Sequence, residues 1–169
     1  TTETALNIYL SERLRDFHAQ YPGIRLRISN HSTPEAIQAV KSGTADLAVV
    51  STPTDIHDPL RAQLLMKASD ILVGNRQYDF LTKEPVHLAE IARYPLICLG
   101  RHTTTYEFYY KFYLEHGLIL SPDTEVATID QIPPMILHNL GIGFLPEKLA
   151  RDAISQGKVV KIPLIEQIP

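Results

Sequence analysis

The spacing of hydrophobic residues in the first fifty positions changes from a helical period to a strand period. Apolar side chains recur every three or four residues over 6–21, which predicts an amphipathic helix. Apolar and polar residues then alternate over 24–28, as in a half-exposed strand. A second helix, capped by Ser32 or Thr33, leads into an apolar strand over 45–50. Helices alternating with strands predict an α/β fold.

The rest of the chain continues this alternation. Short apolar runs predict further strands at 63–66, 71–73, 96–99, 125–128, 142–145 and 159–162. Helical patterns cover 86–92, an aromatic-rich stretch that opens after residue 100, and 130–139 and 147–155. The polar segment 74–85 predicts a loop.

Length and charge narrow the class of protein. The 169 residues suffice for one large domain or two small lobes. A net charge of -3 argues against a domain that by itself binds the phosphate backbone of a nucleic acid. No apolar run is long enough to span a membrane, and no export signal is visible at the start. A single cysteine, Cys98, excludes an internal disulfide and fits a reducing compartment, so we predict a cytoplasmic location.

Four sequence blocks resemble one known family. They are LRDFHAQYPGIRLRI (14–28), EAIQAVKSGTADLAVV (35–50), LHNLGIGFLP (137–146) and GKVVKIPL (157–164). In this order and spacing they are similar to the effector-binding domain of LysR-type transcriptional regulators. The resemblance implies two Rossmann-like lobes with a cleft between them, as in type 2 periplasmic binding proteins.

The resemblance also implies a domain layout. Residues 1–70 would form lobe I, residues 71–165 lobe II, and residues 166–169 the start of a return crossover. The family's winged helix-turn-helix and linker helix are not in this chain, and we expect the first strand and the return elements of lobe I to be missing as well. DNA binding would therefore belong to the intact protein. The family implies a homodimer or homotetramer, with an interface expected at 6–17 and 130–139.

Hydroxyl side chains gather where the predicted strands end, which is where ligands bind in open α/β sheets. Helix N-termini at these points favour a small anion or carboxylate. The candidate effector-binding residues are Thr1, Thr2, Thr4, Ser32, Thr33, Ser51, Thr52, His102, Thr103, Thr104 and Thr128. Each hydroxyl has an alternative role as a helix cap or turn former. The threonines near the start and residues 30–34 look most like the members that sense sulfur compounds or cysteine precursors.

Two other functions are compatible with this fold: a solute-binding protein for transport, and an enzyme. The acids that an enzyme would use are Asp46, Asp55, Asp58 and Asp130, and we expect them to be caps or surface charges. No histidine pair has the i, i+4 spacing of a helical metal site, and Cys98 lacks a positioned base. We therefore predict a sensor of a small molecule, without catalytic residues, metal or cofactor.

Overall fold

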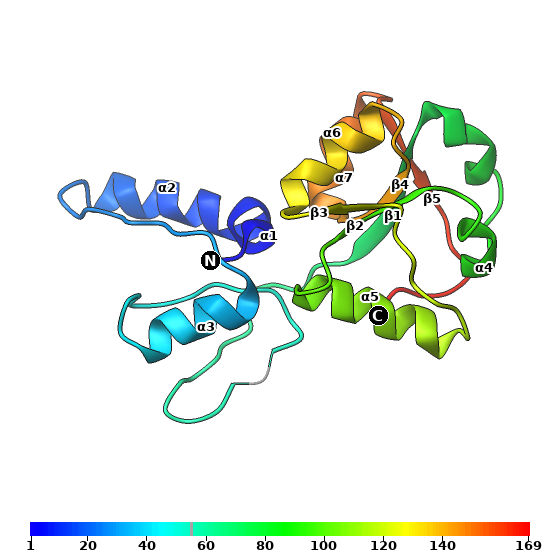
Figure 1. The fold of residues 1–169 in the computed structure, drawn as a ribbon. Helices are drawn as coiled ribbons and strands as arrows, with labels where there is room; N and C mark the ends of the chain where they lie inside the picture. The colour runs from blue at the N-terminus through cyan, green and yellow to red at the C-terminus, as the bar shows by residue number, and fades with distance from the viewer. Residues whose placement is uncertain (55) are drawn as a thin grey trace. The chain divides into compact units, whose positions relative to one another are not determined.

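The chain divides into two compact units. The computed structural model describes residues 1–54 and 56–169 (Figure 1). Unit 1 is Thr1–Lys67 and unit 2 is Ala68–Pro169. Asp55, one of the acids named above, lies outside the described residues. The boundary falls just before the first strand of unit 2.

Unit 2 contains a mixed five-stranded sheet in the order β3-β2-β4-β1-β5. The strands are β1 (Asp70–Asn75), β2 (Leu96–Leu99), β3 (Thr124–Val126), β4 (Ile142–Pro146) and β5 (Val159–Ile162). β1 runs antiparallel to both β4 and β5, whereas β2 runs parallel to β3 and β4. All five strands fall on apolar runs that predict strands, so the α/β class is confirmed.

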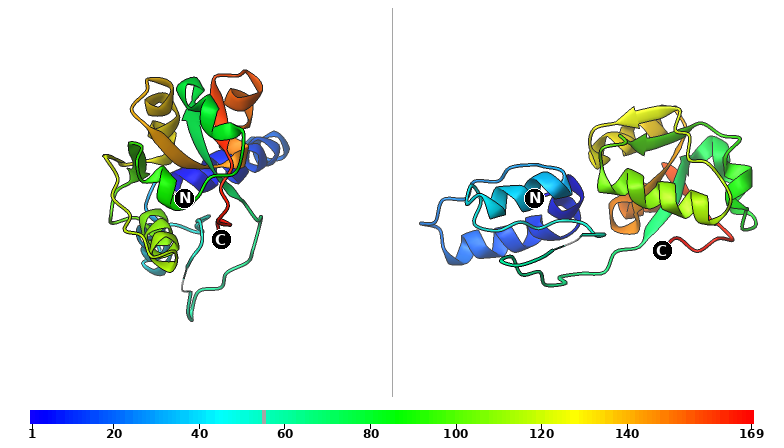
Figure 2. Two further views of the ribbon diagram at one scale, coloured as in Figure 1. Left: turned by 90° about the vertical axis from the view of Figure 1, so that its right-hand side faces the viewer. Right: turned by 60° about the horizontal axis from the view of Figure 1, so that its bottom comes forward.

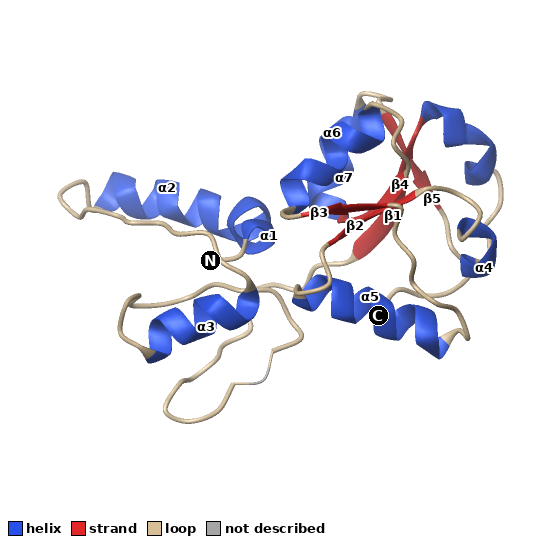
Figure 3. Cartoon of the chain, in the orientation of Figure 1, coloured by secondary structure: helices blue, strands red, loops and turns tan. Residues whose placement is uncertain are grey.

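Helices cover both faces of this sheet, and each face has its own hydrophobic core (Figures 1 and 3). Successive residues of a strand point to opposite faces. Leu72 therefore packs with the residues of α4 and α5, while Ile71 and Val73 pack with those of α6 and α7. The helices are α4 (Leu88–Ile91), α5 (Thr104–Glu115), α6 (Ile132–Leu137) and α7 (Glu147–Ser155). Figure 2 shows the same layers from two further directions.

One helical segment departs from the sequence prediction. Residues 74–85 predict a loop, but Arg76–Thr82 form a 3-10 helix, η2, after the cap Asn75. The Asn75 side chain accepts a hydrogen bond from the Gln77 backbone N–H at 3.1 Å. Tyr78 and Leu81 are buried, with 5% and 6% of their surface exposed. The sequence of this segment is mostly polar because, of the side chains in η2, Tyr78 and Leu81 are the ones that face the core.

The segment after β5 is tied to α4. The backbone N–H of Val86 donates to Pro163 O at 3.0 Å, and Ile165 N–H donates to Val86 O at 3.0 Å. Glu166 accepts from the Leu88 N–H at 2.8 Å and lies 3.1 Å from the His87 ring. Partial burial opposes ionisation of Glu166, but these two partners outweigh it and lower its pKa.

Unit 1 is built from helices and extended segments. A continuous helical run consists of α1 (Glu3–Ala5), the π-helical η1 (Leu6–Leu10) and α2 (Ser11–Gln20), and α3 spans Thr33–Lys41. Ser32 caps α3 in a capping box with Glu35. In the described chain, no helix is both long and apolar enough to cross a membrane.

Three predicted strands are wrong in the structure. Residues 24–28, 45–50 and 63–66 carry no strand among the described residues. Their apolar side chains stay exposed, with Leu26 at 43%, Leu47 at 68% and Leu64 at 67%. The alternation of residues is present, but a strand also needs a neighbour along its length. Among the described residues, these segments form isolated backbone bonds, such as Thr2 N–H to Val49 O at 3.2 Å, instead of a ladder between strands.

We predict that Gly141→Ala destabilises unit 2 by about 3 kcal/mol or more. Gly141 has φ +151°, and a Cβ there would overlap the carbonyl oxygen of Pro95, which accepts the Ile142 N–H at 2.9 Å. Chemical denaturation followed by circular dichroism measures the change. Gly23→Ala is the control, because a Cβ at Gly23 meets no atom within 4 Å. A loss at Gly141 no larger than at Gly23 would contradict the prediction.

Candidate functional site

Four of the predicted hydroxyl residues come together in unit 1. The Thr2 and Ser51 hydroxyls lie 3.4 Å apart, and Thr33 Oγ1 donates to Ser51 O at 3.3 Å. Thr1 Oγ1 donates to Val49 O at 2.9 Å. Thr2 and Thr33 are the two buried polar residues of the described chain, at 9% and 6% exposed. The end of the 45–50 segment and the starts of α1 and α3 therefore meet at one hydroxyl-rich point.

The backbone of Thr1 and Thr2 explains why this point forms. The Thr1 amino group donates to Ser29 O at 3.0 Å, and His31 N–H donates to Thr1 O at 2.9 Å. On the other side, Thr2 N–H donates to Val49 O at 3.2 Å. These two residues thus bridge the extended segments that follow residues 24 and 45. The hydroxyl cluster depends on this bridge.

The other hydroxyls predicted in unit 1 lie apart from the cluster or serve as caps. Ser32 Oγ donates to Glu35 Oε2 at 2.8 Å, and the Ser32 N–H bonds to the same oxygen at 2.9 Å. This is the capping role named as the alternative. Thr4 is half-buried within α1, and Thr52 is exposed beside a cis bond to Pro53.

In unit 2, the predicted residues 102–104 meet at the N-terminus of α5. Thr103 is the cap: its Oγ1 accepts from the Tyr106 N–H at 3.1 Å and donates to Gly100 O at 2.8 Å. Thr104 begins the helix, and no described residue hydrogen-bonds to its hydroxyl. His102 is exposed and lies over Gly100. The first turn of a twelve-residue helix thus presents free N–H groups and one free hydroxyl.

Arg101, which precedes this turn, forms an exposed ion pair. Arg101 Nε lies 3.3 Å from Glu125 Oε1, and both side chains are exposed, at 74% and 41%. Thr128 follows β3 and begins the short 3-10 helix η3 (Ile129–Gln131). Gln131 Oε1 accepts from the Ala127 N–H at 2.9 Å and the Thr128 N–H at 3.2 Å. Among the described residues, the start of α5 therefore presents N–H groups and the Thr104 hydroxyl beside a paired Arg101.

A buried polar pair beneath α5 was not predicted from the sequence. The Tyr109 hydroxyl donates to the carboxylate of Asp70, the first residue of β1. Burial raises the pKa of Asp70, and the bond from Tyr109 only partly offsets this. Burial, followed by the charge of Asp70, raises the pKa of Tyr109. The two residues are 39 positions apart in the sequence, so the spacing of neighbouring residues does not predict that they form a pair.

The space under the first turn of α5 is nearly filled. A cavity of about 10 Å³ is lined by Thr105, Tyr109, Cys98, Phe144, Ile129 and three further apolar residues of β2 and α6. This volume is about the minimum for one water molecule. Burial raises the pKa of Cys98 to about 11, with a smaller contribution from Glu125. Cys98 is therefore a core residue without the activated thiolate that a nucleophile requires.

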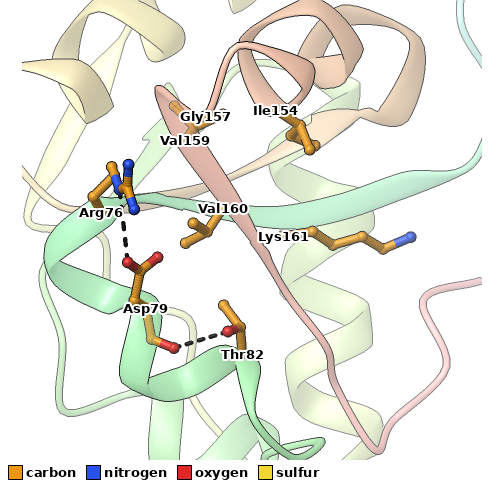
Figure 4. Close-up of a pocket in the computed structure, with 8 residues that line it drawn as sticks. All are labelled: Arg76, Asp79, Thr82, Ile154, Gly157, Val159, Val160 and Lys161. Carbon is orange, nitrogen blue, oxygen red and sulfur yellow. Dashed lines mark hydrogen bonds and ion pairs between the residues drawn. The ribbon is translucent and has the colours of Figure 1, made fainter.

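A shallow groove of about 310 Å³ lies between η2 and β5, away from every predicted site residue. Figure 4 shows Arg76 and Asp79 of η2 on one side, with Val160 of β5 facing them and Lys161 pointing away. Arg76 and Asp79 form an exposed ion pair at 3.7 Å. This groove lacks buried polar groups aimed into it.

The acidic residues that an enzyme could use lie on the surface where the structure describes them. Asp46, Asp58 and Asp130 are exposed, as expected for caps or surface acids. Within the described residues no group of three or more His, Cys, Asp or Glu side chains could hold a metal ion.

Comparison with known proteins gives one family. The family model "LysR substrate binding domain" matches residues 1–169. YwbI of Bacillus subtilis, an uncharacterized HTH-type transcriptional regulator, is 24% identical over 155 residues, which are 92% of this chain and 51% of YwbI. CmpR of Synechocystis, an HTH-type transcriptional activator, is 20% identical over 85% of this chain and 47% of its own length. The chain spans about half the length of these relatives.

The fold is also similar to a solved regulatory domain. The CcmR regulatory domain of Synechocystis, in complex with 2-PG, has a TM-score of 0.84 at 16% identity. That match covers 98% of this chain and 79% of the other. Because the sequence identity is below 25%, this structural similarity shows only the fold, which is that of a type 2 periplasmic-binding-protein-like domain.

We predict that Cys98 is unreactive in the folded protein. A thiol that is 4% exposed, with a raised pKa, offers little thiolate to an alkylating or disulfide reagent. Labelling with a chromogenic disulfide should be at least about 100-fold slower than for a cysteine introduced at the exposed Ser42, and should become fast on denaturation. Equal labelling rates at the two positions in the folded protein would refute this.

We predict that Asp70→Asn stabilises unit 2 and that the gain grows as the pH rises above the ordinary value of 3.8. Because the pKa of the folded carboxyl is raised, the folded wild type binds more protons than the unfolded chain between the unfolded and the folded pKa, so its free energy of unfolding falls as the pH rises through that window. The amide does not titrate. Urea unfolding of both proteins at pH 4.5, 6 and 7.5 measures the difference. A gain that stays constant or shrinks toward pH 7.5 is the contrary result.

Proposed function

The chain belongs to the LysR substrate binding domain family, and we propose that it senses a small anionic metabolite for a LysR-type transcriptional regulator. Its relatives are transcriptional regulators rather than enzymes or transport proteins. The observation that carries the anion proposal is the first turn of α5. Its N–H groups and the free Thr104 hydroxyl are the kind of donors that bind oxyanions.

The ligand is held, in this proposal, by neutral donors. The cluster of Thr1, Thr2, Thr33 and Ser51 offers hydroxyls in unit 1, and the start of α5 offers them in unit 2. Arg101 is already paired with Glu125. A carboxylate, sulfate or phosphate group of a small metabolite fits this chemistry better than a polyanion, which calls for clustered basic residues.

The effector would act by changing the relative populations of two conformations of the domain. A ligand that binds one arrangement of the two lobes more tightly shifts the equilibrium toward it, and coupling of about 1–3 kcal/mol is typical. In the intact protein this shift would change how DNA is contacted by a domain outside this chain. A cytoplasmic location belongs to the same proposal, because such a regulator acts on DNA.

We also propose that the domain works as a homodimer or homotetramer. The segments expected at the interface, 6–17 and 130–139, carry the exposed apolar side chains of Phe17 and Leu137, at 37% and 43%, and Tyr21 and Leu140 lie just beyond them, at 45% and 44% exposed. Exposed apolar groups of this size favour contact with a partner. Transport and catalysis are less well supported, because the relatives are regulators and the described candidate acids are exposed.

Sulfate or 2-PG should raise the melting temperature of the protein. At a hundred times its Kd, a ligand adds about 2.7 kcal/mol to the free energy of unfolding, which moves the midpoint by several degrees. Thr104→Ala should weaken binding by roughly 10- to 100-fold, since it removes one hydrogen bond to a charged group. A thermal-shift titration, confirmed by calorimetry, measures both effects.

The matched control is Thr82→Ala. The Thr82 hydroxyl donates to Asp79 O at 2.8 Å within η2, so its loss should leave ligand affinity unchanged. Equal weakening in the two variants would argue against a site at α5. A protein that melts cooperatively and responds to no small anion, carboxylates included, would overturn the anionic class of effector.

A further inference from the structure

Two hydrogen bonds hold the start of β1, close to the point in the sequence where unit 2 begins. Unit 1 ends at Lys67, and Asp70 opens β1 three residues later. Ser69 O accepts the Glu147 N–H at 2.9 Å, and the Asp70 carboxylate accepts the Tyr109 hydroxyl. Residues 69 and 70, at the start of unit 2, are therefore each held by one hydrogen bond. The first donor is a backbone N–H of α7, and the second is a side chain of α5.

Tyr109 joins this point to the helix end that carries the candidate site. It lies five residues after Thr104 on α5 and is 2% exposed. Its ring stacks on Phe144 of β4 at 4.5 Å between centroids, with an interplanar angle of 24°. With Thr105 it lines the small cavity under the first turn. The Tyr109 ring therefore borders the first turn of α5 on one side and packs on β4 on another.

No other side-chain hydrogen bond joins α5 to a strand within residues 1–54 and 56–169. The helix is otherwise held on the sheet by apolar packing of residues such as Phe112. Tyr113, one turn after Tyr109, is equally buried, yet its hydroxyl has no partner among the described atoms. Two buried tyrosines on one helix thus differ in hydrogen bonding, since among the described residues Tyr109 is bonded to β1 and Tyr113 has no partner.

We propose that Asp70 and Tyr109 are positioning residues of the effector response, whose hydrogen bond transmits ordering of the first turn of α5 to the start of β1. The proposal rests on the proposed function, because it assumes that an anion binds at that turn. Anion binding fixes the turn, the rigid helix carries Tyr109 with it, and the Asp70 carboxylate follows. The response reaches the residues through which the chain passes into unit 2.

The link itself can be tested without any ligand. Hydrogen exchange of the whole chain, measured on peptides covering 68–73, 103–108 and 147–155, compares the wild type with Tyr109→Phe. Loss of the bond should speed exchange in both 68–73 and 103–108 by roughly tenfold and leave 147–155 in α7 unchanged. Acceleration in 103–108 alone, or in all three peptides equally, would overturn the proposal.

Matched variants separate the bond from a general effect on the fold. Tyr113→Phe removes a buried hydroxyl from the same helix, but that hydroxyl has no partner, so both peptides should exchange as in the wild type. Asp70→Asn keeps an acceptor for Tyr109, so its exchange in 68–73 and 103–108 should be no faster than in the wild type, whereas Asp70→Ala should behave like Tyr109→Phe. Asp70→Ala also tests the link should Tyr109→Phe fail to fold. Similar effects of Tyr113→Phe and Tyr109→Phe would contradict the proposal.

A second arm adds inorganic sulfate as the probe. In the wild type and in Tyr113→Phe, sulfate should slow exchange in both 103–108 and 68–73. In Tyr109→Phe it should still slow 103–108 but no longer 68–73. Slowing of both peptides in Tyr109→Phe refutes transmission through this bond. Absence of any sulfate effect in the wild type counts against the anion site, while the ligand-free comparison still decides the link.

Discussion

The structure of unit 2 depends on the antiparallel pairing of β1 with β4 on one side and β5 on the other. Because β1 has a neighbour on each side, its backbone groups are satisfied and both of its faces can be covered. Leu72 then joins one core while Ile71 and Val73 join the other. Gly74 leaves room for Tyr78, since a Cβ there would lie 2.8 Å from that ring. The same strand begins at Asp70, so the sheet, the 3-10 helix and the polar pair beneath α5 share one element.

The sequence predicts unit 2 far better than unit 1, and the reason is physical. Runs such as 96–99 and 142–145 are buried on both faces, and their hydrophobicity identifies them without knowledge of their neighbours. The alternation over 24–28 indicates a strand only if a partner strand is present, and among the described residues no strand pairs with it. The helix η2 was missed because two buried side chains leave little periodicity.

The candidate site shows the same division between local and distant information. Capping by Thr103 follows from the residues beside it, as does the turn that carries Thr104. The contact of Thr2 with Ser51 could be expected once both were placed at strand ends. The bond between Asp70 and Tyr109 could not, because it depends on how α5 lies across β4 and β1. The pairing of Arg101 with Glu125 likewise needed the register of β2 against β3.

That Arg101–Glu125 pair has a consequence for the conditions in which an anion sensor of this kind can work. Attraction between a free cation and an anion acts over several ångströms and weakens as salt accumulates. Hydroxyls donate only at contact distance, whereas the dipole of a helix N-terminus is itself screened by salt. With Arg101 paired to Glu125, the site proposed at the start of α5 would lose less affinity as salt rises than a site built on a free guanidinium. In the proposed function, its response would therefore depend more on the concentration of the metabolite than on the ionic strength around it.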